Sequence, residues 1–79
     1  MSNRVSLPHK MKTKFLEYDV VRSVRSLTKS VPKGTTGTVL MVFESANSRY
    51  EVEFVNRAGE SLAVLTVDEK DLELIQRMM

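Results

Sequence analysis

The fold class of this chain is decided by residues 34–43, GTTGTVLMVF. The two glycines in this stretch predict a tight turn, because glycine alone enters the φ > 0 region without steric cost. The β-branched apolar run that follows predicts a strand over residues 36–44. Both faces of this strand are apolar, which predicts a central strand covered on both sides or one that bends across a barrel. One predicted face consists of Val39, Met41 and Phe43, and the other consists of Leu40 and Val42.

Residues 50–55, YEVEFV, form the second clear strand, which follows a hairpin loop expected at residues 45–48. Tyrosine, valine and phenylalanine alternate there with two glutamates, Glu51 and Glu53. Such period-two alternation predicts one buried face and one solvated face.

Three weaker strands complete the pattern. Residues 15–24 open the fold, residues 60–67 are nearly all apolar, and residues 73–75 close it. A helical turn is expected at residues 69–72, with Asp68 as its cap. The sequence of residues 14–17 is compatible with a second helical turn. Five short antiparallel strands, with one helical turn before the last, predict a mainly β fold, an SH3-like barrel over residues 15–79.

Size and composition exclude several classes of protein. Seventy-nine residues make one domain. The absence of cysteine excludes disulfides and thiolate metal sites and suits a reducing cytoplasm. The longest apolar run, residues 39–43, is far shorter than the ~20 residues of a membrane helix. We therefore expect a cytoplasmic domain without a membrane segment.

Charge is unevenly distributed along the chain. Residues 1–16 carry four basic side chains and no acid, whereas residues 34–79 carry eight acids and four basic side chains. Residues 1–14 form a basic leader with too few apolar side chains to fold alone, so we expect it to be disordered or packed on a partner.

No catalytic constellation is visible, and we expect no enzyme, cofactor or metal site. His9 is the only histidine and lies in the leader. The serines and threonines have no base to activate them. The turn at Gly34 and Gly37 lacks the Gly-Lys-Ser/Thr ending of a phosphate loop. Glu51 and Glu53 are best explained as solubilising groups on an exposed sheet face.

Basic side chains on the first strand and the following loop, near two tyrosines, are the candidate partner-binding residues. Such a cluster can form a shallow basic surface with a stacking platform for single-stranded nucleic acid, or be an ordinary solvated surface. The candidates are Tyr18, Arg22, Arg25, Lys29, Lys33 and Tyr50.

Four motifs in order resemble an uncharacterised family of short bacterial proteins, domain of unknown function 4926. They are DVVR at residues 19–22, GTTGTV at 34–39, YEVEFV at 50–55 and GESLAVLT at 59–66. The resemblance covers residues 15–75 and implies an SH3-like fold with no established activity. The glycine turn is also similar to that of KOW modules, some of which bind RNA or ribosomal and polymerase partners. Where the KOW-like pattern has a glycine before the aspartate, this chain has Tyr18.

These observations predict a non-enzymatic interaction module that binds another protein, with self-association as one form of this function. The alternative is weak nucleic-acid binding through the basic first third of the chain.

Overall fold

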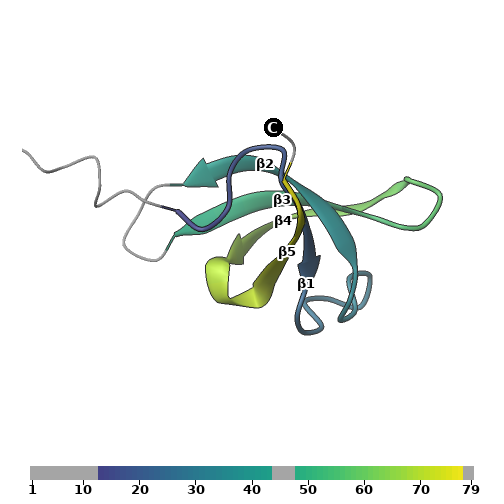
Figure 1. The fold of residues 1–79 in the computed structure, drawn as a ribbon. Coiled ribbons are helices and arrows are strands. Elements are labelled where there is room, and N and C mark those ends of the chain that lie inside the picture. The colour runs from purple at the N-terminus through teal and green to yellow at the C-terminus, as the bar shows by residue number, and fades with distance from the viewer. Residues whose placement is uncertain (1–12, 44–47, 78–79) are drawn as a thin grey trace, which may run out of the picture.

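The computed structural model describes residues 13–43 and 48–77. Its five strands form one antiparallel sheet in the order β4-β3-β2-β1-β5, which is twisted and curled (Figure 1). A 3-10 helix, η2 (Glu69–Asp71), precedes the last strand. The predicted mainly β fold, a five-stranded SH3-like barrel with one helical turn, is confirmed. The strands are β1 (Val20–Ser23), β2 (Thr36–Phe43), β3 (Arg49–Val55), β4 (Ser61–Asp68) and β5 (Leu72–Gln76).

The concave face of the sheet encloses a core to which every strand contributes. The predicted alternation of β3 is confirmed, because Tyr50, Val52 and Phe54 are fully buried and its two glutamates lie on the other face. Val31 is also buried, and Leu27 packs against the core, so the loop between β1 and β2 is pinned to it. The core residues are Phe15, Val21, Val31, Val39, Tyr50, Val52, Phe54, Val67 and Leu72.

A β-bulge changes the predicted faces of β2. Val39 pairs with Val52 and Met41 with Glu51, so Leu40 is an extra residue in the ladder. The alternation therefore shifts by one, and Met41 and Phe43 are exposed although Val39 is buried. The prediction that these three side chains share one face was wrong because pairing with β3 inserts this bulge. Of the two alternatives for β2, the strand covered on both sides is contradicted, whereas the strand that bends across a barrel is consistent with the bulge.

The two glycines of the decisive stretch have different roles. Gly34 has φ 89°, which confirms the predicted left-handed turn residue. Gly37 lies within β2 and is buried, without a positive φ. A Cβ built on Gly37 would lie 2.7 Å from Val52 Cγ1 and 2.9 Å from the carbonyl oxygen of Glu53. Gly37 is therefore required for the close approach of β2 to β3, and not for the turn.

Two local features at the ends of the barrel differ from what the sequence suggested. Residues 14–17 contain bends and the start of a turn instead of a helical turn. Asp68 precedes η2 but makes no capping hydrogen bond; its carboxylate pairs with Arg49 at 3.2 Å. Asp68 is half-buried beside an arginine on the neighbouring strand, and this contact replaces the cap.

Some expectations fall outside the described residues. These are the conformation of residues 1–12, which make up most of the leader, and most of the hairpin loop at residues 44–47. Across residues 13–43 and 48–77, no helix has the length and apolar character needed to span a membrane.

Candidate protein-binding surface

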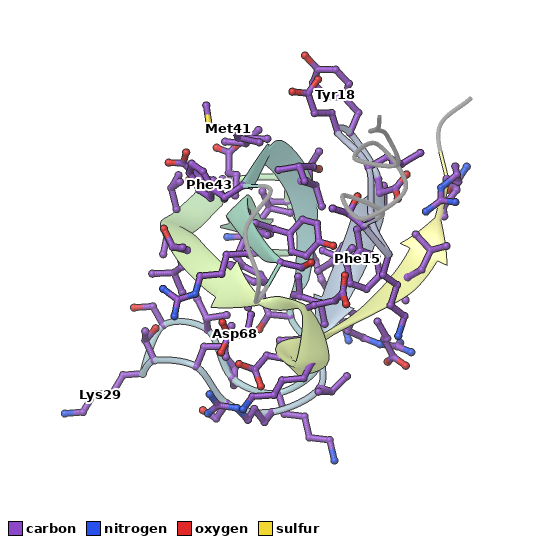
Figure 2. All side chains as sticks on the ribbon, turned by 90° about the vertical axis from the view of Figure 1, so that its left-hand side faces the viewer. Phe15, Tyr18, Lys29, Met41, Phe43 and Asp68 are labelled. Atoms are coloured by element: carbon purple, nitrogen blue, oxygen red, sulfur yellow. The ribbon has the colours of Figure 1, made fainter. Side chains whose placement is uncertain are left out.

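Exposed apolar side chains lie on the turn before β1 and at the bulge of β2, two segments whose backbones meet. The backbone N–H of Tyr18 donates a hydrogen bond of 2.7 Å to the carbonyl of Val39, which places this turn beside the first residue of the bulge. Figure 2 shows Tyr18, Met41 and Phe43 in the upper part of the view, at the end of the molecule opposite Lys29. We call the following group the apolar patch: Leu16, Tyr18, Leu40, Met41 and Phe43.

Tyr18 has a conformation that is costly for a residue with a side chain. Its φ is +70°, and its side chain is 61% exposed, so no burial of the ring offsets the strain. A left-handed backbone costs a non-glycine residue roughly 1–2 kcal/mol. Strain retained at an exposed aromatic side chain is a mark of functional sites.

Hydrogen bonds to Asp19 hold the strained turn in place. The Asp19 N–H donates to the carbonyl of Leu16 at 3.1 Å, and the Leu16 N–H donates to Asp19 Oδ2 at 2.9 Å. The Val39 N–H donates to the Asp19 carbonyl at 2.9 Å. The Asp19 carboxylate and backbone thus fix where Tyr18 lies.

A buried ion pair ties the same turn to the end of the chain. The Asp19 carboxylate is buried, and Arg77 approaches it with Nη2 to Oδ2 at 2.7 Å. Arg77 also donates to the carbonyl of Lys14 at 3.1 Å. The hydrogen bond from Arg77 lowers the pKa of Asp19 below its ordinary value, more than burial raises it. The sequence did not reveal this pair, because its members are 58 positions apart.

Replacing Tyr18 separates the strain from the side chain. We expect Tyr18→Gly to be more stable than Tyr18→Ala by about 1 kcal/mol, because both remove the ring but only glycine accepts φ +70° freely. For a domain of this size, that difference corresponds to about 4–8 °C in melting temperature. Thermal unfolding followed by circular dichroism measures it. Equal melting temperatures for the two variants would contradict the strained conformation.

Two glutamates border the apolar patch on the convex face of the sheet. Glu51 lies opposite Met41 on β2 and Thr66 on β4, and Glu53 lies opposite Thr38 and Val64. Both are half-buried and, within the described residues, neither has an ion-pair partner. The surface is therefore apolar with an acidic margin.

Tyr50 does not belong to any surface. Its side chain is fully buried, and its ring meets that of Phe15 edge-on with centroids 5.2 Å apart. Its hydroxyl accepts the Phe15 N–H at 3.2 Å and donates to the Glu69 carboxylate at 2.5 Å. Burial, and then the bond to Glu69, raise the pKa of Tyr50. The expectation that Tyr50 is an exposed stacking platform was wrong, because distant polar partners allow its hydroxyl to be buried.

The two candidate arginines are each paired with an acid. Arg22 Nε lies 2.7 Å from a Glu73 carboxylate oxygen on β5. Arg25 holds Asp71 with two bonds, of 2.8 Å and 3.1 Å, and Asp71 raises the pKa of Arg25. Both pairs connect β1 or its following loop to the segment after β4, so they have a structural role as well as a charge.

The two candidate lysines lie apart from the exposed tyrosine. Lys29 projects from the loop after β1, at the opposite end from Tyr18 (Figure 2). Lys33 lines a shallow groove with Arg22 and Glu73. The structure brings Arg22 and Lys33 together, but it does not gather the candidate basic residues beside Tyr18.

The acidic side chains of the described residues mostly join chain segments. Within residues 13–43 and 48–77, no three histidine, cysteine, aspartate or glutamate side chains are grouped to hold a metal ion. The best-formed polar clusters, at Asp19 and Asp71, are ion pairs that join chain segments. The surface feature that combines exposed apolar side chains with a strained backbone is the apolar patch at Tyr18.

Fold and surface together define a small SH3-like barrel with an exposed apolar patch. The model described as Domain of unknown function (DUF4926) matches residues 17–74, so the chain belongs to this family. Comparisons with curated proteins and with solved structures gave no match.

Proposed function

We propose that this protein is a non-enzymatic interaction module that binds another protein through the apolar patch. The observation that carries the proposal is Tyr18, an exposed aromatic side chain held in a strained backbone conformation beside three further exposed apolar residues of β2. Tyrosine, phenylalanine and methionine are enriched in protein interfaces, and tyrosine is frequent among the residues that dominate binding energy. We place the module in the cytoplasm as part of the same proposal, since a chain without cysteine needs no oxidising compartment.

The acidic margin indicates the character of the partner. Glu51 and Glu53 are next to the patch, so a partner with basic side chains around an apolar centre would complement it. The same margin disfavours nucleic acid at this face, because phosphates would be repelled. Nucleic-acid binding through the basic residues, the alternative function, has less support, since Arg22 and Arg25 are already paired with acids and Lys29 lies far from Tyr18.

The test of the proposal uses variants that remain folded. We expect Tyr18→Gly and Met41→Ser each to weaken binding of the partner about tenfold or more, as truncation of central interface residues does. Ile75→Ser is the matched control, because Ile75 on β5 is 45% exposed and Met41 is 46% exposed. Immobilised wild-type protein captures candidate partners, and the affinity of each purified partner is then measured by calorimetry.

The stability of Tyr18→Gly makes this experiment decisive. The variant relieves strain, so weaker binding cannot be attributed to unfolding. A partner that binds wild type and all three variants equally would exclude the patch as the binding site. Capture of no protein at all, with a low-salt shift of single-stranded RNA, would support the nucleic-acid alternative instead.

A further inference from the structure

Strand β4 has a free edge along its whole length. It is at one end of the strand order, and among the described residues its eight residues pair only with β3. The loop after β1 satisfies its own backbone, with Leu27 and Val31 joined by a hydrogen bond of 2.9 Å, and gives none to β4. A row of N–H and C=O groups on β4 is therefore available for pairing with another strand.

The edge of β4 has few of the features that normally prevent edge-to-edge association, because its one register shift against β3, at Leu62, leaves residues 63–67 regular. Its sequence, SLAVLTVD, contains no lysine, arginine, proline or glycine, and Leu62 and Val64 are exposed. Natural sheets protect long free edges with such residues or with bulges. The other edge, β5, has five residues and carries Glu73 in an ion pair with Arg22, so it is shorter and charged.

The loop after β1 does not close against the second half of β4. A groove of about 380 Å³ separates the loop after β1 from this part of the strand. Its walls are Arg25, Leu27 and Thr28 on the loop side and residues 65–68 on the strand side. Figure 2 shows Asp68 and Lys29 at this side of the molecule, with Lys29 pointing away from the barrel.

We propose that two copies of this chain associate by antiparallel pairing of their β4 strands across a two-fold axis, which joins the two sheets into one. An antiparallel edge is its own complement, so a second copy satisfies the free backbone groups without any other partner. Charge also favours a second copy, because the only charged residue of β4, Asp68, is already neutralised by Arg49. Pairing centred on Leu65 places residues 63–67 of each copy, all apolar or threonine, against one another.

The dimer is independent of the apolar patch, and sedimentation tests it. We expect wild-type protein at high concentration to sediment at twice its 9.0 kDa mass and to dissociate on dilution. We expect Val64→Lys to remain at the monomer mass at every concentration. A lysine there lies opposite Glu53 within its own copy, so the fold is retained, but two like charges meet near the two-fold axis.

Ile75→Lys is the matched control, since Ile75 and Val64 are 45% and 47% exposed. It should dimerise as wild type does. Thr66→Lys lies opposite Glu51 within its own copy and next to the two-fold axis in the dimer, so it should behave as Val64→Lys does. Hydrogen exchange provides a second measure, with amides of β4 protected at high concentration and exchanging faster on dilution. A wild-type monomer at all concentrations, a dimer that survives both β4 variants, or an open-ended series of larger species would overturn the proposal.

Discussion

Replacing Gly37 by alanine is expected to lower the free energy of unfolding by about 2–3 kcal/mol, which is the upper part of the range for overpacking a core. The added Cβ would lie 2.7 Å from Val52 Cγ1, 2.9 Å from the Glu53 carbonyl oxygen and 2.9 Å from Phe54 Cδ1. One of these atoms belongs to the backbone, so a simple change of rotamer cannot relieve the clash. Strands β2 and β3 must move apart, and the core between them loses contacts.

Gly34→Ala is the control for this prediction. A Cβ at Gly34 meets no atom within 4 Å, but its φ of 89° makes any side chain strained. We expect a loss of about 1 kcal/mol there, from backbone strain alone. Urea denaturation of the two variants measures both values. An alanine at Gly37 that costs no more than one at Gly34 would show that the two strands are not in close contact at this point.

The alternation of β3 was predictable because it depends only on residues two positions apart. Tyr50, Val52 and Phe54 need a single buried face, and that requirement is written in six consecutive residues. The bulge of β2 was not predictable in the same way, since the inserted Leu40 is defined by its pairing with β3. Gly37 was assigned to the turn for the same reason, because its contacts with β3 are absent from its own neighbourhood in the sequence.

Polar side chains were harder to place than apolar ones. The alternation of β3 predicts a buried Tyr50 ring, but the partners of its hydroxyl, Glu69 and the Phe15 N–H, are 19 and 35 positions away in the sequence. The basic candidates Arg22 and Arg25 look free until their partners on the C-terminal segment are known. The member of the candidate list that remains exposed and lies within the apolar patch is Tyr18. We propose its role in binding from its positive φ, a backbone angle that composition and residue spacing do not determine.

Removal of the Asp19 side chain is the second change with a large expected effect. Asp19→Ala removes the acceptor of the Leu16 N–H and leaves the Arg77 guanidinium without its partner. We expect a loss of about 2–3 kcal/mol, below the 3–5 kcal/mol that breaking a fully buried pair costs. The reason for the lower value is that the Arg77 side chain is 35% exposed and can be solvated in the variant.

The pH dependence of stability distinguishes the charge of Asp19 from its hydrogen bonds. The folded protein lowers the pKa of Asp19, so its ionisation stabilises the fold above the unfolded pKa of about 3.9. This contribution disappears as the pH falls through the folded pKa. We therefore expect the stability difference between wild type and Asp19→Asn, which keeps an acceptor for Leu16, to be constant near neutral pH and to shrink below about pH 4. Urea denaturation at a series of pH values measures this difference, and a gap that stays constant into acid would show that the Arg77 pair does not stabilise the turn that carries Tyr18.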